Sequence, residues 1–198
     1  MAAHSPRSTL VLIDFINDIV HPDGKLAGKG YSDFIGRHGT LAKVATLLAH
    51  ARSKGMDAIH VRIGFSPDYK EQPLGSPLFG HAGKLGALKL GSWGTEFHPL
   101  AAPIDGEAVM AKHRVNAFVG TPLDVILRTR GVTDLVVAGC STDVGVQTTA
   151  RMAHDLDYAC TVIGDCCAAP KDEDHEQTLR MLAKVARVTT LAEFMAAP

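Results

Sequence analysis

Several features that would mark a special class of protein are missing from this sequence of 198 residues. It has no Lys- or Arg-rich run and a formal net charge of -1 at pH 7, so it offers no electrostatic footprint for nucleic acid or an anionic membrane surface. No window approaches the roughly 20 apolar residues of a membrane span, and residues 1–7 include no apolar stretch of the signal-peptide type. We therefore expect a cytoplasmic protein that acts on a small molecule, with neither nucleic acid nor membrane as a partner.

Cysteine and aromatic residues are also scarce. The four cysteines lack the CxxC or Cys/His spacing of metal sites and are expected to be buried thiols in a reducing compartment: Cys140, Cys160, Cys166 and Cys167. Aromatic residues make up 6% of the chain, whereas the 46% hydrophobic and 21% charged residues are ordinary for a globular protein. The length is enough for one large core and does not require two, so we expect residues 1–198 to form a single domain.

What the sequence does contain is an alternation of short apolar runs with segments of helical spacing. The apolar runs predict six strands, at residues 9–14, 57–63, 107–112, 134–139, 160–165 and 187–191. The helical spacing predicts helices at 41–51, 121–131, 146–156 and 175–186. Two segments rich in glycine and proline, 21–38 and 64–99, are predicted to be loops. Strands that alternate with helices indicate an α/β sandwich with right-handed crossovers.

Two of the predicted strands end in a charged residue. Asp14 closes the first apolar run and Lys112 closes the third. Ligands of open α/β sheets bind at the carboxyl ends of the strands, and a lysine beside an acid can lower the pKa of the carboxylate or orient a substrate oxygen. An aspartate at this place is equally typical of a helix N-cap or a turn, so residue type and position leave both interpretations open.

Residues 135–151 have the pattern of a buried strand, a tight turn and the start of a helix. Such an elbow lets an α/β enzyme aim backbone N–H groups at an anionic substrate atom. A reactive side chain is usually found there. The residue at the start of this helix is Gly145, which has no side chain to react.

The predicted loop 64–99 carries most of the aromatic side chains outside the strands and helices. Such side chains either line a pocket or anchor the loop to the core. Phe65 and Trp93 are our candidates for substrate contact.

Three motifs, read together, are similar to those of a known family. Residues 10–18, 112–123 and 137–150 resemble, in order and spacing, the three signatures of the isochorismatase-like hydrolases, also called the cysteine hydrolases. Residues 91–96 look like the family segment that precedes the lysine strand. The resemblance implies a Rossmann-like, three-layer sandwich with a six-stranded parallel sheet and helices on both faces. It also implies a homo-oligomer, a dimer or a tetramer.

The resemblance further implies an Asp-Lys-Cys triad. Asp14 would be the acid/base, Lys112 its charged neighbour, and the nucleophilic cysteine would stand at position 145, where this chain has glycine. The bond between Cys140 and Ser141 is the candidate for the unusual cis peptide of the family. The N–H groups of Ser141 and Gly145 would form the oxyanion hole.

Three interpretations of Gly145 follow. The chain could cleave a vinyl ether with Asp14 as general acid and water as the attacking group, as in the true isochorismatases, which also have glycine here. Residues 141–150 look more like the cysteine-bearing amidohydrolases with only the nucleophile changed, by natural loss or by an engineered substitution. The third interpretation is a ligand-binding or scaffold protein without catalysis.

No metal or other cofactor is predicted. The zinc-bearing nicotinamidases of the superfamily use an Asp/His cluster after the first strand, and residues 21–38 hold no such close-spaced set. A further departure from the family pattern is Ile16, where the family commonly has glutamine.

Overall fold

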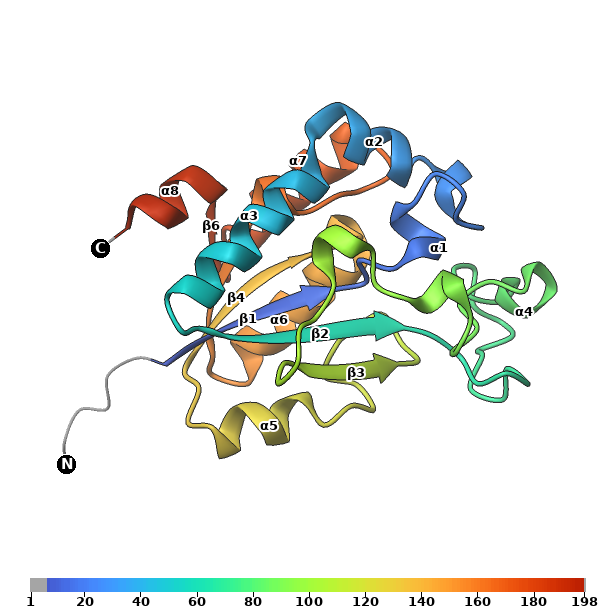
Figure 1. Ribbon diagram of the computed structural model, residues 1–198, viewed down its shortest axis with the longest axis horizontal. Helices are drawn as coiled ribbons and strands as arrows, with labels where there is room; N and C mark the ends of the chain where they lie inside the picture. Colours follow the sequence, from blue (N-terminus) through green and yellow to red (C-terminus); the bar gives the residue numbers. More distant parts are fainter. Residues whose placement is uncertain (1–6, 198) are drawn as a thin grey trace.

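The computed structural model describes residues 7–197, and its centre is a six-stranded parallel sheet. The strand order is β3-β2-β1-β4-β5-β6 (Figure 1). The strands are β1 (Ser8–Ile13), β2 (Asp57–Ile63), β3 (Ala108–Lys112), β4 (Asp134–Gly139), β5 (Ala159–Ile163) and β6 (Arg187–Thr189). This confirms the predicted α/β fold with six parallel strands, each within two residues of its expected bounds.

The apolar runs of β1 and β4 are explained by their place at the centre of the sheet. Residues 9–13 of β1 and 135–139 of β4 are buried throughout, because both faces of a parallel sheet are covered. The two strands run in register from Ser8 opposite Asp134 to Ile13 opposite Gly139. A Cβ atom on Gly139 would lie 2.8 Å from the Cβ of Ile13, so glycine is needed where these strands end.

Helices cover both faces of the sheet. In Figure 1, α3 (Thr40–Ser53) and α8 (Leu191–Ala196) lie on one side and α5 (Leu123–Thr129) on the other. The helix α6 (Gln147–Asp155) lies near α5. Tyr158, which follows α6 in the chain, donates a hydrogen bond from its hydroxyl to Asp124 of α5 (2.8 Å). The helix α7 (Asp172–Leu182) connects β5 to β6. None of the helices within residues 7–197 has the length and apolar character needed to cross a membrane.

The prediction that residues 21–38 form a loop was right for 21–26 and wrong for the rest of the segment, which is largely helical. After the short helix α1 (Asn17–Val20), this segment contains the 3-10 turn η1 (Ala27–Lys29) and the helix α2 (Tyr31–His38). Gly30 and Gly39 adopt φ values of 105° and 62°, so they end helical turns at conformations that favour glycine. The glycines that suggested a loop therefore mark the boundaries between short helices.

Residues 64–99 form a mostly irregular segment, as expected, with one short helix, α4 (Ala82–Leu85), and the 3-10 turn η2 (Trp93–Thr95). The buried carboxylate of Asp18 holds this segment over the strand ends. It accepts hydrogen bonds from the N–H groups of Leu88 (2.6 Å) and Lys25 (3.3 Å). Gly94 packs directly against this carboxylate, since a Cβ there would lie 2.3 Å from Asp18 Oδ2.

A cluster of charged residues fixes the segment before β3. Glu107 accepts two hydrogen bonds from the guanidinium of Arg52 on α3, of 2.8 and 2.9 Å, and one from the Ile104 N–H. His60, fully buried on β2, lies 2.9 Å from Glu107 Oε2. These contacts, with Arg52 foremost, offset the burial of the Glu107 carboxyl and lower its pKa to about 2.

We predict that Glu107→Gln lowers the free energy of unfolding at pH 7 by about 1 to 3 kcal/mol, since Arg52 and His60 lose a charged acceptor. The folded-state pKa of Glu107 is depressed from 4.5 to about 2. Its contribution is therefore full above pH 4.5 and is lost as the pH falls toward 2. Denaturant unfolding of both proteins between pH 7 and pH 2.5 checks this, and a pH-independent difference would contradict it.

Candidate active site

Asp14 follows the carboxyl end of β1 and is buried in the protein. Its φ of 60° is a left-handed conformation, which aspartate adopts more readily than most residues and which is enriched at functional sites. The Asp14 N–H donates to the Val61 carbonyl (2.8 Å), and its Oδ1 accepts a hydrogen bond from the Ile63 N–H (2.6 Å). Both contacts tie the aspartate to the end of the neighbouring strand β2. Only 5% of the residue is exposed.

Lys112 reaches the same carboxylate from the end of β3. Its Nζ lies 2.7 Å from Asp14 Oδ2 and 3.2 Å from the carbonyl oxygen of Arg114. The residue is 1% exposed, so this is a buried ion pair. Burial raises the pKa of Asp14, and the charge and hydrogen bond of Lys112 oppose that rise.

The turn after β4 forms the other side of the site. The peptide bond between Cys140 and Ser141 is cis. Residues Thr142–Val146 then form a single π-helical turn, η4, which leads into α6. No acceptor within residues 7–197 takes a hydrogen bond from the Ser141 N–H. This N–H is therefore free to bind a ligand at the turn.

Gly145 lies in the π-helical turn and faces the carboxylate. A Cβ built on it would lie 3.7 Å from Asp14 Oδ2, 3.6 Å from the Cγ2 of Ile13 and 3.8 Å from the carbonyl oxygen of Cys140. These are ordinary van der Waals contacts, and the φ of Gly145 is outside the left-handed region. Position 145 can therefore hold a side chain without strain, directly beside Asp14.

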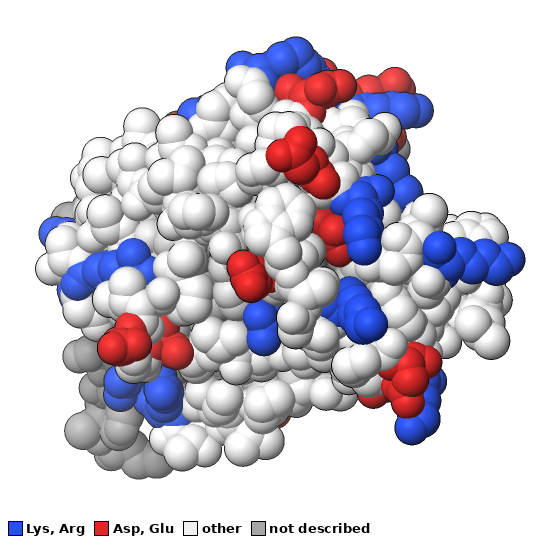
Figure 2. All heavy atoms as spheres, turned by 45° about the vertical axis from the view of Figure 1, so that its right-hand side comes forward, with Lys and Arg blue, Asp and Glu red and all other residues white. Residues whose placement is uncertain are grey.

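These residues converge on one cavity, whose space of about 520 Å³ is partly open to solvent. Asp14, Lys112, Cys140, Ser141 and Gly145 all contribute to its wall. The rest of the wall is mostly apolar: Ile19, Leu26, Ile63, Leu78, Phe79, Leu88, Val115 and Val144, together with Lys29 and Tyr31. On the face shown in Figure 2, basic and acidic side chains are interspersed.

The two aromatic residues chosen as substrate contacts are not part of this wall. Phe65 is fully buried and packs against Tyr69, Phe79 and His113, so it anchors the loop to the core. Trp93 is 46% exposed, packs edge-on against His21, and its carbonyl accepts a hydrogen bond from the Asn17 side chain. Phe79 is the aromatic residue of residues 64–99 that does line the cavity.

Lys29 and Tyr31 were missed at the sequence level. They lie at the end of η1 and the start of α2, in the segment that was expected to be a loop. The signal that could have found them is their place after β1, because segments that follow a strand at the carboxyl edge cover the ligand site in parallel sheets. Burial raises the pKa of the Tyr31 phenol, which therefore stays protonated and can donate a hydrogen bond.

Of the four cysteines, Cys140 is the one that lines the cavity together with Asp14. Its thiol is nevertheless a poor nucleophile. It is buried, and burial together with the negative charge of Asp14 raises the pKa of its thiol well above 9. The thiolate is the reactive form, so this thiol is unreactive near neutral pH. The other three cysteines are likewise free and buried.

His175, on α7, contacts the first residue of the turn that follows β4. Its Nδ1 lies 2.8 Å from the hydroxyl of Thr142, the first residue of η4, and the Thr142 N–H donates to the Ala168 carbonyl (2.8 Å). Burial lowers the pKa of His175. The same histidine also lines a second cavity of about 350 Å³. No group of three His, Cys, Asp or Glu side chains among residues 7–197 is arranged to hold a metal ion.

Comparison with known proteins shows which family the chain belongs to. The model of the isochorismatase domain matches residues 8–193. The chain belongs to the isochorismatase family. It is 32% identical over 158 residues to the isochorismatase family protein YecD of Escherichia coli O157:H7, covering 77% of this chain and 80% of the relative.

Three further proteins are similar to this chain at 26 to 33% identity. A ureidoacrylate amidohydrolase, RutB, from Methylobacterium radiotolerans is 33% identical over 178 residues, which cover 82% of this chain and 68% of the relative. Among solved structures, an isochorismatase family protein from Desulfovibrio vulgaris superposes with a TM-score of 0.85 at 30% identity and covers 96% of this chain and 97% of its own. N-carbamoylsarcosine amidase from Thermoplasma acidophilum superposes with a TM-score of 0.74 at 26% identity. The superposition covers 93% of this chain and 96% of the amidase.

We predict that Lys112→Met lowers the free energy of unfolding at pH 7 by about 3 to 5 kcal/mol, because it leaves the buried Asp14 carboxylate without its cation. The raised pKa of Asp14 should rise further without Lys112, so acidification neutralises the carboxyl and reduces the loss.

The matched control is the double variant Asp14→Asn with Lys112→Met, which removes both charges. It should be more stable than the sum of the two single losses implies, as measured by denaturant unfolding in a double-mutant cycle. Strictly additive losses would show that the two side chains do not act as a pair.

Proposed function

We propose that this isochorismatase family member is a hydrolase of a small molecule, with a site of the amidohydrolase type. In this proposal Asp14 is the acid/base, Lys112 is its charged neighbour, and position 145 is where the nucleophile of the family would stand. The proposal treats residues 1–198 as one catalytic domain, which assembles as a homo-oligomer, a dimer or a tetramer.

The observation that carries the proposal is the space beside Gly145. A Cβ at this position would have no contact closer than 3.6 Å and would lie 3.7 Å from Asp14 Oδ2. A thiol one bond further out could reach the carboxylate, which is the geometry that activates a nucleophile through an adjacent base. The relatives named as ureidoacrylate amidohydrolase and N-carbamoylsarcosine amidase support C–N bond hydrolysis as the chemistry.

With a cysteine at position 145, the reaction would use Asp14 twice. The carboxylate takes the thiol proton, and the sulfur attacks the amide carbon to form a tetrahedral oxyanion that the Ser141 and position-145 N–H groups stabilise. Asp14 then returns the proton to the departing nitrogen. Water, deprotonated by Asp14, finally cleaves the thioester and releases the acid.

With glycine at position 145, no acyl-enzyme forms, and water must attack the substrate carbon directly. Asp14 accepts the proton of that water and delivers it to the leaving nitrogen, while the Ser141 N–H still binds the oxyanion. The Lys112 ammonium orients the carboxylate during both transfers. Removing a nucleophile costs on the order of 10⁶ in kcat in a well-measured hydrolase, so this route is expected to be slow.

The experiment is to compare the unaltered chain with Gly145→Cys on small amides, including ureidoacrylate, N-carbamoylsarcosine and nicotinamide. We expect Gly145→Cys to raise kcat/KM on at least one of them by about 10³-fold or more. Release of the amine or ammonia is the readout, and mass spectrometry detects the thioester.

Gly145→Ala is the matched control, because it fills the same space without a nucleophile and should show no gain in rate over the unaltered chain. Addition of Asp14→Asn to the cysteine variant should abolish the gain. A cysteine variant that is folded but inactive on every amide would overturn the amidohydrolase proposal.

A second candidate function is vinyl ether hydrolysis, and the raised pKa of Asp14 favours it. A protonated Asp14 would donate its proton to the vinyl carbon, and water would attack the resulting oxocarbenium carbon in the space beside Gly145. The hemiketal then collapses to a ketone and an alcohol. Turnover of isochorismate by the unaltered chain, lost in Asp14→Ala, would favour this function. Inactivity of every variant together with tight ligand binding would favour a protein that only binds.

A further inference from the structure

The cavity has a charged group that the reaction does not use. Lys29, at the end of η1, lines the cavity but is exposed at its mouth. The lysines that form ion pairs within residues 7–197 are Lys43, Lys70 and Lys112, and Lys29 is not among them. Its ammonium is therefore available to a ligand.

The backbone that carries Lys29 is held firmly. The next residue, Gly30, has a φ of 105°, and a Cβ on it would lie 2.7 Å from the carbonyl oxygen of Pro170. This close approach fixes the turn between η1 and α2 against the segment before α7. The two neighbouring cavity residues, Lys29 and Tyr31, are thereby presented from a defined position.

The charges that line the cavity do not cancel. Asp14 and Lys112 form a buried ion pair, and the Tyr31 phenol and Cys140 thiol stay protonated because burial raises the pKa of each. Asp143 does not line the cavity, but its negative charge contributes to the raised pKa of both groups, so this acid lies near the reacting end. Among the described residues that line the cavity, Lys29 is the cation without an acidic partner, and most of the other lining side chains are apolar, such as Leu26, Phe79 and Leu88. The cavity thus combines a reacting carboxyl, apolar walls and an exposed cation.

We propose that Lys29 is a specificity-determining residue, which binds a carboxylate at the far end of a small amide substrate from the bond that is cleaved. The substrate class is therefore an ω-carboxylate amide with a short apolar body. The assignment rests on the proposed function for the reacting end, whereas the anion site itself is independent of catalysis.

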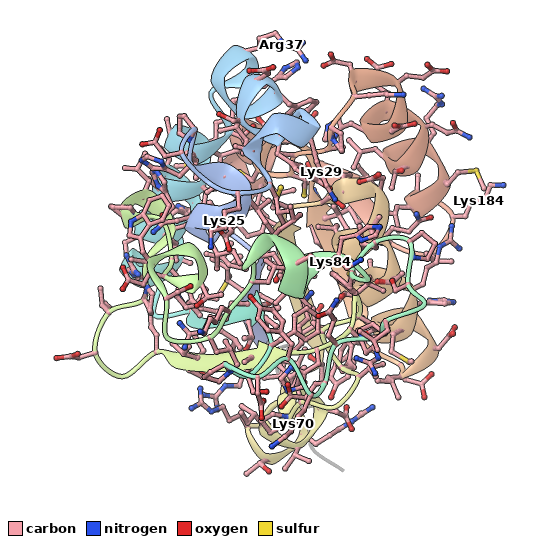
Figure 3. The ribbon with its side chains drawn as sticks, turned by 90° about the vertical axis from the view of Figure 1, so that its right-hand side faces the viewer. Lys25, Lys29, Arg37, Lys70, Lys84 and Lys184 are labelled. Atoms are coloured by element: carbon pink, nitrogen blue, oxygen red, sulfur yellow. The ribbon has the colours of Figure 1, made fainter. Side chains whose placement is uncertain are left out.

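Figure 3 shows the arrangement that provides the control. Lys25, Lys29 and Lys84 lie around the centre of the face that carries the strand ends, and Arg37, Lys70 and Lys184 lie toward its periphery. The Lys25 ammonium donates to the Gly86 carbonyl. Lys84 is exposed on α4 and does not line the cavity. Lys84→Met therefore removes one charge from the same face without touching the proposed site.

The test uses matched probes that differ only in charge. Succinamate, glutaramate and adipamate each carry one carboxylate and one amide, and the corresponding diamides are their neutral counterparts. By calorimetry with the unaltered chain, we expect the best monoanion to bind about tenfold more tightly than its diamide, and this ratio to fall as salt is added. Affinity should rise by up to about fourfold per methylene as long as each added methylene contacts the apolar walls.

Lys29→Met should reduce the ratio between monoanion and diamide to about one, and Lys29→Arg should restore most of it. Lys84→Met should leave the ratio unchanged. A merely structural role of Lys29 would weaken both probes equally and keep their ratio. The proposal is overturned if no monoanion binds more tightly than its diamide, or if Lys29→Met leaves the preference intact.

The two proposals fail in different ways. If the Gly145→Cys variant hydrolyses no amide while the monoanions still bind through Lys29, the anion site stands and the amidohydrolase proposal fails. If that variant hydrolyses monoamides and diamides with equal kcat/KM, the catalytic proposal stands and the role of Lys29 is wrong.

Discussion

The site depends on one buried ion pair, between Asp14 and Lys112. The two residues end strands β1 and β3, which lie on either side of β2, so the pair spans the end of a third strand. That strand contributes as well, since the Ile63 N–H donates to the other oxygen of the same carboxylate. Three adjacent strand ends are thus joined at a single side chain.

Such a pair is costly to form in a protein interior. Removing two charges from water costs several kcal/mol per ion, and their mutual attraction recovers this only with good geometry and further hydrogen bonds. Here the lysine has a second acceptor in the Arg114 carbonyl, and the carboxylate has a backbone donor. Apolar residues of similar volume often stabilise a fold at least as well as a buried ion pair does. The proposed function offers a reason for the pair, which holds a carboxyl of raised pKa in the wall of the cavity.

The strained conformation of Asp14 fits the same explanation. Its left-handed φ directs the carboxylate away from the line of β1, and the Val61 carbonyl and Ile63 N–H fix the backbone and side chain in that direction. The turn after β4 brings Gly145 to the opposite side of the carboxylate, with His175 supporting it through Thr142. A carboxyl held between a lysine and an open backbone turn fits the proton transfer that we propose.

The sequence alone determined the elements of the sheet and the identity of the chemical groups. Runs such as 9–13 and 135–139 are apolar because central parallel strands are buried on both faces, and Asp14, Lys112 and Gly145 follow from where those runs end. Tertiary structure decided the features that the local pattern of apolar and polar residues does not specify. The strand order placed Asp14 and Lys112 on either side of β2, and packing between distant segments buried Phe65 in the core but brought Lys29, Tyr31 and Phe79 to the cavity. Which loop residues face a ligand depends on contacts far apart in the chain, such as Gly30 with Pro170 and Asp18 with Leu88, and no local pattern encodes them.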